Sequence, residues 1–240
     1  LTASGSGFDP SYCTAFKSDG IIAISNGTFT INSLSGANGG KLFSADGEIN
    51  ISGGNFTTNT AGNGGTYTNT LGVADSFSTA SFTSDTNINI SGGTFTVTNT
   101  GNDGKGISAD VNVTISGTAQ IGITNSGAKG KAIKADGNIQ VDGGTTTISL
   151  SGATVLTASG SGFDPSYPSG LKATGTITIN SGNVTVTGTS AATGTKGISA
   201  DGNIIINGGT INVTTEGNGA VYTSATGTTD SYSSAAITTD

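Results

Sequence analysis

The sequence predicts an all-β fold, specifically a right-handed parallel β-helix (a solenoid) of about eight three-strand coils with loop inserts. Three observations predict it. A frame of about 26 residues recurs along the chain, apolar residues alternate with period two inside each frame, and Gly, Thr, Ser and Asn replace the usual helix formers. The 240 residues are expected to form a single β-helix domain, 1–240, that is a fragment of a longer solenoid.

The repeated frame is clearest in residues 196–214, which read KGISADGNIIINGGTINVT. A marker residue, nearly always Asp, fixes the frame each time it recurs, at Asp19, Asp46, Asp85, Asp110, Asp136, Thr174, Asp201 and Asp240. Successive markers are 27, 39, 25, 26, 38, 27 and 39 residues apart, so some units carry an insert of about 12 residues. A fixed period of this length is typical of repeat architectures.

Each unit contains three short apolar segments. In the last complete unit these are Ile198 before the marker, Ile204 and Ile206 after it, and a further pair beyond the Gly-Gly turn. Such alternation predicts three half-buried strands. One unit cannot bury its apolar face alone, so the units should stack about 4.8 Å apart with Ile on Ile and Phe on Phe. The alternatives are a β-propeller, whose blades need about 40 residues, and an adhesin-like sandwich.

A longer repeat is superimposed on the short one. Residues 1–12 recur unchanged as 156–167, and the same offset relates 1–85 to 156–240. Both ends of the sequence read as uncapped coils, which in solenoids favour edge-to-edge association. We therefore expect either a longer natural protein or self-association through open coil ends.

Composition narrows the function classes. The net charge of −7 argues against nucleic acid as a partner, and no apolar run is long enough to predict membrane insertion. The chain has no His and no Arg, and its serines have no base partner, so no catalytic residues and no enzyme activity are predicted. Cys13 is the only cysteine, and the sequence does not assign it a role.

The frame KGISADGNI-x-INGGTINV resembles a family of bacterial secreted β-helix proteins that contain carbohydrate-binding domains and are similar in fold to pectate lyases. The resemblance extends over essentially the whole chain. It implies a non-catalytic, calcium-associated protein that binds plant-type polysaccharide, of the cellulose or pectin type. It also implies an extracellular or cell-surface location in a bacterium.

The marker aspartates are the candidate metal ligands: Asp19, Asp46, Asp85, Asp110, Asp136 and Asp201. In stacked units they should lie one above another, and neighbouring carboxylates about 5 Å apart repel. One interpretation is a structural ladder, in which Asp accepts backbone N–H bonds and nearby Lys neutralises the charge. The other is a calcium site, since Ca²⁺ takes carboxylate and carbonyl oxygens.

The inserts carry the candidate carbohydrate-binding residues: Tyr12, Tyr67, Asp75, Tyr167, Asp164, Tyr222, Asp230 and Tyr232. Tyrosine rings can stack on the C–H faces of sugars while their hydroxyls form hydrogen bonds. The alternative is that the rings fold back over their own loops and that the acids form ordinary turns. A flat outward face of Thr and Asn on the third strands, with Thr94 and Thr96 at its centre, is a further candidate surface.

Two functions remain open at this point. The first is an extracellular, non-catalytic polysaccharide-binding protein that is stabilised by calcium. The second is a structural cell-surface fibre or adhesin subunit that self-assembles end to end into a filament. Repeated regular faces favour the fibre, whereas irregular loops rich in aromatic residues favour binding.

Overall fold

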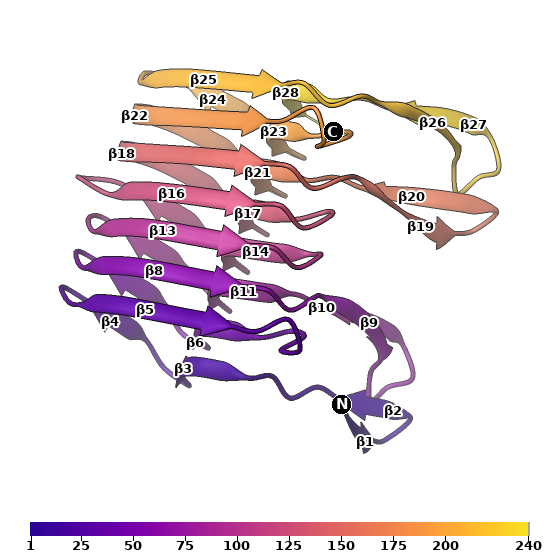
Figure 1. Ribbon diagram of the computed structural model, residues 1–240, viewed down its shortest axis with the longest axis horizontal. Helices are drawn as coiled ribbons and strands as arrows, with labels where there is room; N and C mark the ends of the chain where they lie inside the picture. Colours follow the sequence, from indigo (N-terminus) through magenta and orange to yellow (C-terminus); the bar gives the residue numbers. More distant parts are fainter. Residues whose placement is uncertain (240) are drawn as a thin grey trace.

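The computed structural model describes residues 1–239, and this part of the chain is all-β. A parallel sheet of eight strands forms one wall (Figure 1). Its strands, in spatial order, are β28 (Ala235–Thr239), β23 (Lys196–Ala200), β21 (Ser169–Ala173), β17 (Lys131–Ala135), β14 (Gly104–Ala109), β11 (Thr79–Ser84), β6 (Lys41–Ala45) and β3 (Thr14–Ser18). We number eight levels along this sheet, from level 1 at β3 to level 8 at β28.

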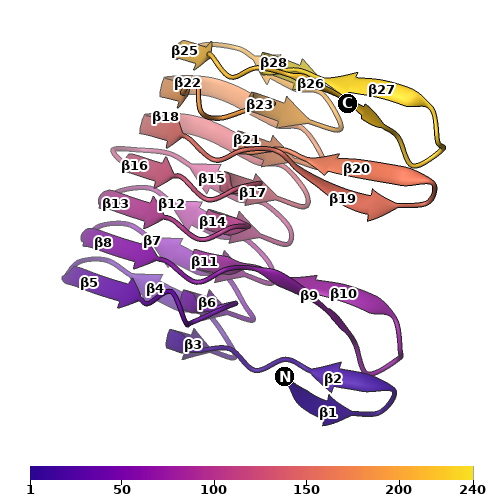
Figure 2. The same cartoon turned by 45° about the vertical axis from the view of Figure 1, so that its right-hand side comes forward.

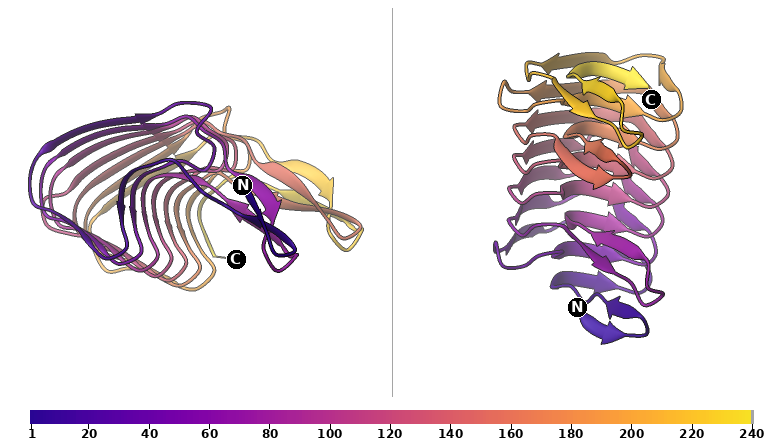
Figure 3. Two further views of the ribbon diagram at one scale, coloured as in Figure 1. Left: turned by 90° about the horizontal axis from the view of Figure 1, so that it is seen from below. Right: turned by 90° about the vertical axis from the view of Figure 1, so that its right-hand side faces the viewer.

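A second parallel sheet of 12 strands forms the other wall and curls around the core, as the view from below in Figure 3 shows. Its short strands are β4 (Ile22–Ile24), β7 (Ile49–Ile51), β12 (Ile88–Ile90), β15 (Val113–Ile115) and β24 (Ile204–Ile206). Its longer strands are β5 (Thr28–Ser33), β8 (Asn55–Thr60), β13 (Thr94–Asn99), β16 (Gln120–Asn125), β25 (Thr210–Thr215), β18 (Ile139–Leu150) and β22 (Ile177–Gly188).

The predicted β-helix of about eight three-strand coils is wrong, although the all-β class is right. The second and third strands of each repeat belong to one curled sheet, because β18 and β22 each run through the bend as single strands of 12 residues. Their pairing shifts register near Asp142 and then resumes. Gly144 and Gly182 have φ of 73° and 89°, so glycine bends the strand where the sequence pattern suggested a turn that ends it.

The predicted alternation is confirmed, and it builds the core. Ile49, Ile88 and Val113 pair in register along the short strands and are fully buried. Near the N-terminus, two columns of phenylalanine stack at centroid distances of 4.6–4.9 Å, and rings of one column meet rings of the other edge to face. The first column is Phe16, Phe43 and Phe82, and the second is Phe29, Phe56 and Phe95. Stacked and edge-to-face rings are both favourable geometries.

One corner of the molecule is built from glycine. At Gly101 a Cβ atom would overlap the carbonyl oxygen of Gly62, and at Gly127 it would overlap that of Gly101. Gly152 stands in the same relation to Gly127. Backbones therefore approach one another here more closely than any side chain permits.

Four antiparallel hairpins project from the stack as two arms (Figure 2). The N-terminal arm joins β1 (Thr2–Ser4) and β2 (Gly7–Asp9) to β9 (Gly65–Thr68) and β10 (Ala74–Phe77). The C-terminal arm joins β19 (Val155–Ser159) and β20 (Gly162–Ser166) to β26 (Ala220–Thr223) and β27 (Thr229–Tyr232). Within the described residues, no helix is long and apolar enough to cross a membrane.

Candidate carbohydrate-binding grooves

The two hairpins of each arm are fastened to each other in the same way. In the N-terminal arm, the backbone N–H of Ser6 donates to the carbonyl oxygen of Thr70 at 2.9 Å. In the C-terminal arm, Ser161 donates to Ala225 at 2.9 Å. A tyrosine follows the first hairpin of each pair, Tyr12 in one arm and Tyr167 in the other, and leads the chain back to the eight-stranded sheet.

A groove of about 550 Å³ lies between the N-terminal arm and levels 1 to 3 of the eight-stranded sheet. We call it the N-terminal groove. Its lining combines an aromatic ring, two ammonium groups, two carboxylates and several hydroxyls: Pro10, Ser11, Tyr12, Thr14, Lys17, Lys41, Ser44, Asp46, Thr83 and Asp85. A concave site with one aromatic surface and several converging polar groups is the usual form of a small-ligand site.

Tyr12 is the aromatic wall of this groove. Its ring lies 5.7 Å from that of Phe77, and the Lys41 ammonium lies 5.4 Å from the Tyr12 ring centroid. The pKa of Tyr12 is raised to about 12, mainly because the phenol is partly buried. The nearby phenol of Tyr67 and the carboxylates of Asp75 and Asp9 make smaller contributions in the same direction. The Tyr12 hydroxyl therefore keeps its proton at neutral pH and can both donate and accept a hydrogen bond.

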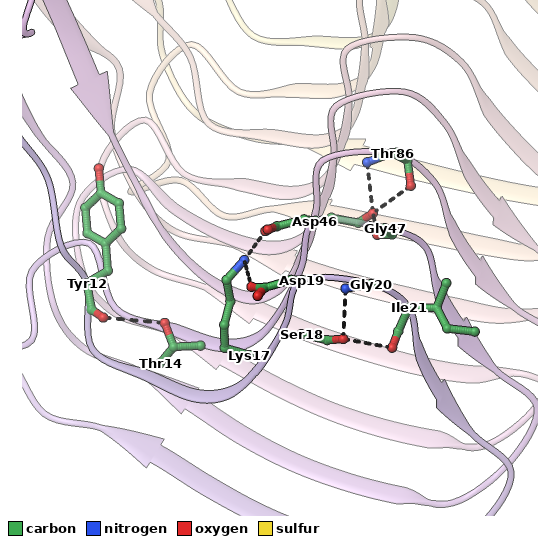
Figure 4. Close-up of polar contacts among 11 residues, drawn as sticks. Tyr12, Thr14, Lys17, Ser18, Asp19, Gly20, Ile21, Asp46, Gly47 and Thr86 are labelled. Carbon is green, nitrogen blue, oxygen red and sulfur yellow. Dashed lines mark hydrogen bonds and ion pairs between the residues drawn. The ribbon is translucent and has the colours of Figure 1, made fainter.

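Lys17 closes the opposite side of the groove (Figure 4). Its ammonium forms an ion pair with Asp46 of the next level and lies 3.9 Å from Asp19 of its own level. Lys17 and Asp46 are both about half exposed, at 45% of each side chain. Charged groups at this exposure can exchange partners with a ligand at little cost, because water already solvates them.

Tyr67 and Asp75 form a second polar element on the same arm. The Tyr67 hydroxyl donates to Asp75 Oδ2 at 3.1 Å, and its ring lies 6.3 Å from that of Phe77. The backbone N–H of Ser76 and then the Tyr67 hydroxyl lower the pKa of Asp75, so this exposed carboxylate stays ionised. An ionised carboxylate is an acceptor for the hydroxyl groups of a ligand.

The C-terminal arm repeats this arrangement 155 residues later. The Tyr167 ring lies 6.0 Å from that of Tyr232, which takes the place of Phe77, and the Lys196 ammonium lies 4.7 Å from the Tyr167 ring centroid. The Tyr222 hydroxyl donates to Asp230 at 3.1 Å. Lys172 forms an ion pair with Asp201 of the next level, as Lys17 does with Asp46. We call this region the C-terminal groove by its correspondence to the N-terminal groove, since equivalent side chains make equivalent contacts.

A protein-family match extends into both groove regions. The family described as carbohydrate-binding domain-containing protein matches residues 1–127 and again residues 114–219. The chain belongs to this carbohydrate-binding domain family. Each of the two matches contains one complete Tyr–Lys pair, Tyr12 with Lys41 and Tyr167 with Lys196. No curated protein and no solved structure matches the chain.

The structure brings most of the predicted carbohydrate-binding residues together. Tyr12, Tyr67 and Asp75 lie on the N-terminal arm, while Tyr167, Tyr222, Tyr232 and Asp230 lie on the C-terminal arm. Asp164 is exposed and pairs with Thr157 inside the β19–β20 hairpin, on the same arm. The tyrosines are half-buried and also pack on aromatic rings of their own arm, on Phe77 in the N-terminal arm and on Tyr232 in the C-terminal arm. The alternative of rings covering their own loops therefore holds in part.

The lysines of the grooves are the functional candidates that sequence reasoning missed. They had been interpreted only as partners of the aspartate column. Lys41 and Lys196 instead lie beside tyrosine rings, half-buried. One signal was present in the sequence, because these two lysines are 155 residues apart, as are Tyr12 and Tyr167.

The aspartate column stacks as expected. The backbone N–H of Asp46 bonds to Ser18 of the level below, and that of Asp110 bonds to Ser84. Asp85, Asp136 and Asp201 follow the same pattern, Thr174 takes the Asp position at level 6, and Asp240 lies outside the described residues. The column aspartates are all exposed to solvent, where repulsion at this spacing is only about 1 kcal/mol.

The column aspartates are spread along the stack, at most one at each level. Among residues 1–239, no three His, Cys, Asp or Glu side chains lie close enough together to hold a metal ion. Lysines hold four of the column carboxylates in ion pairs, namely those of Asp19, Asp46, Asp136 and Asp201. The arrangement fits the structural ladder better than a calcium site, and calcium at these residues stays a prediction.

Four lysines share one row of the eight-stranded sheet, at levels 2, 4, 5 and 7: Lys41, Lys105, Lys131 and Lys196. Lys131 donates to the carbonyl oxygens of Tyr167 and Lys129. Burial of the ammonium lowers the pKa of Lys131 to about 7 and that of Lys105 to about 8. Lys131 is therefore only partly charged at neutral pH, whereas Lys105 stays mostly charged.

The outward Thr face is present on the solvent-facing surface of the curled sheet, opposite the buried core. Thr94 and Thr96 of β13 are exposed and pair in register with β8 and β16. A hollow of about 180 Å³ lies over it, lined by Thr94, Phe95, Gln120, Ile121, Gly122, Thr145 and Thr147. This hollow has no charged group and its only aromatic residue is Phe95, which is buried, so it offers a ligand fewer kinds of contact than the grooves.

Proposed function

We propose that this chain is an extracellular, non-catalytic protein that binds polysaccharide in the N-terminal and C-terminal grooves. The single observation that carries the proposal is an arrangement found at both arms. A tyrosine ring lies beside a lysine, and a second tyrosine of the same arm donates to an exposed carboxylate. Membership in a carbohydrate-binding domain family supports the same partner. The resemblance of the repeat frame to secreted proteins supports the extracellular location.

The groove chemistry suits a hydroxyl-rich ligand. A sugar presents C–H faces that can lie on Tyr12 and hydroxyls that can donate to Asp46 or Asp85 and accept from Lys17. These features support a carbohydrate as the partner, and the resemblance of the repeat frame to polysaccharide-binding proteins supports a polymer of the cellulose or pectin type.

A retention assay on immobilised polysaccharides tests the proposal. The panel should include cellulose and polygalacturonate, and the proteins should be the wild type and the double variant Tyr12→Ala/Tyr167→Ala. We expect the wild type to be retained on at least one polymer and the double variant to be lost from it. The matched control is Thr96→Ala/Thr185→Ala, which changes the outward Thr face and should be retained like the wild type.

Two outcomes would contradict the proposal. Wild-type protein that binds no polymer of the panel would remove polysaccharide as the partner. Retention that survives in the tyrosine variant but fails in the threonine variant would move the site to the Thr face. Repeating the assay with a chelator tests the calcium prediction separately, since loss of retention that added Ca²⁺ restores would require a bound ion.

A further inference from the structure

We infer that the two grooves act together as one bivalent site that holds a single polysaccharide chain along the stack. This inference rests on the proposed function and goes beyond it, because it concerns how many sites one polymer occupies. Three observations carry it: the chemistry of the two grooves, their orientation and their separation.

The chemistry of the two grooves is the same. Of the ten residues that line the N-terminal groove, all except Thr14 recur unchanged 155 residues later, and Thr14 is matched by Ser169. The contacts recur as well. The Tyr–Lys distance is 5.4 Å in one groove and 4.7 Å in the other, and the hydroxyl-to-carboxylate hydrogen bond on the arm is 3.1 Å in both. The described residues of the C-terminal groove therefore offer a ligand the same chemical groups, while Asp240, the counterpart of Asp85, lies outside them.

The two grooves face the same way. Lys17 and Lys172 stand at equivalent positions of the same parallel sheet, so their side chains leave the same face in the same direction. Both arms project from the same side of the stack (Figures 1 and 2). A polymer that runs along the stack axis can therefore meet both grooves without reversing direction.

The separation of the grooves is fixed by the sheet. β3 and β21 are five strands apart in its order, which corresponds to about 24 Å at about 4.8 Å per strand. The levels between the arms are joined by short turns, residues 100–103 and 126–130, and not by hairpins. A continuous hydrogen-bonded ladder connects the two sites, so binding in one groove places the polymer at a defined distance from the other.

Bivalency has a measurable consequence. When the second groove is engaged by the same chain, its binding becomes intramolecular, which strengthens overall binding by about 10²–10⁴-fold without any new contact. Fragments shorter than about 24 Å cannot span both grooves. We expect short fragments to bind as two independent equivalents per protein and long polymer to bind far more tightly.

The test uses fragments of graded length from whichever polymer retains the wild type, titrated by calorimetry. For the wild type we expect two equivalents of a short fragment and a step of at least about 10²-fold in affinity once fragments exceed the span. This series needs no variant and does not depend on mutant folding. Affinity that rises smoothly with length, without a step, would overturn the inference.

Single-site variants test the same inference independently. Tyr12→Ala and Tyr167→Ala should each reduce the stoichiometry for short fragments from two to one and abolish the step for long ones. A single variant that lowers polymer affinity only about twofold would show independent sites and overturn bivalency while leaving polysaccharide binding intact. Binding of two separate polymer chains per protein would overturn it in the same way. Failure of the wild type to bind any fragment would overturn the proposed function itself.

Discussion

Residues 1–85 and 156–240 are two copies of one sequence that differ in a systematic way. On the outside, Tyr12 matches Tyr167 and Lys41 matches Lys196. In the core, stacked phenylalanines of the first copy are replaced by aliphatic residues in the second, for example Phe43 by Ile198. The two copies thus share their groove residues and the isoleucines of their short strands, such as Ile49 and Ile204, but they do not share the phenylalanine columns.

This difference separates two kinds of physical demand. A core position at a given level requires an apolar side chain of suitable volume in register with its neighbours, and both Phe43 and Ile198 meet that demand with no exposed surface. Folding makes no comparable demand for a tyrosine, a lysine and a carboxylate on an exposed arm. The shared residues of the arms are consistent with the shared ligand proposed above.

The largest expected effect is on the phenylalanine columns. Phe43→Ala should lower the free energy of unfolding by about 3–5 kcal/mol, because Phe43 is fully buried between Phe16 and Phe82. Ile198→Val, at the matching position, should cost only about 0.5–1.5 kcal/mol. Urea unfolding measures both values. Equal costs, or loss of polysaccharide binding by a variant that is still folded, would contradict the separation of core and groove.

The next effect is at the glycine corner. Gly101→Ala should destabilise the fold by roughly 1–3 kcal/mol, because the new Cβ would overlap the carbonyl oxygen of Gly62. Gly36→Ala is the matched control, since nothing lies within 4 Å of a Cβ at that exposed glycine. Thermal unfolding of both variants tests the prediction, and a Gly101 variant as stable as the control would argue against close backbone approach at this corner.

A pH effect is expected from the lysine row. Burial lowers the pKa of Lys131 to about 7, so between that value and about 10.4 the unfolded chain binds more protons than the folded one. Stability from this group therefore rises with pH above about 7 and is lowest below it. Relative to Lys131→Met, the wild type should gain stability from pH 6 to pH 9, by no more than about 1.4 kcal/mol per pH unit. A stability difference between the wild type and Lys131→Met that does not change from pH 6 to pH 9 would contradict the lowered pKa of Lys131.

The sequence predicted the stacking of the repeats into levels correctly, but it did not predict how the strands of each level are divided between sheets. Alternating pairs such as Ile49 and Ile51 predicted both the buried face and the strand register. Register is fixed because a shift by one residue would turn every apolar side chain of the strand to the solvent face. The bend at Gly143 and Gly144 was interpreted as a turn between strands, because a Gly-Gly pair in sequence does not reveal that the hydrogen-bonded ladder resumes beyond it.

The grooves could be predicted only in part. Tyr12 and Tyr67 were identified by residue type, but their shared neighbour Phe77 depends on two hairpins that lie 60 residues apart and pack without any periodic pattern. Lys41 reaches Tyr12 through the same long-range packing. Self-assembly through the coil ends and the extracellular location depend on properties that lie outside a single chain, and they stay predictions.

The most direct test of the central claim is tyrosine fluorescence. The chain has no Trp, and all five of its tyrosines, Tyr12, Tyr67, Tyr167, Tyr222 and Tyr232, belong to the two groove regions. Titration with the polysaccharide that retains the wild type should change the emission saturably, and Tyr12→Ala/Tyr167→Ala should abolish the change while the far-ultraviolet spectrum stays the same. Unchanged wild-type emission at saturating polysaccharide would show that the sugar binds elsewhere and would contradict the assignment of the grooves.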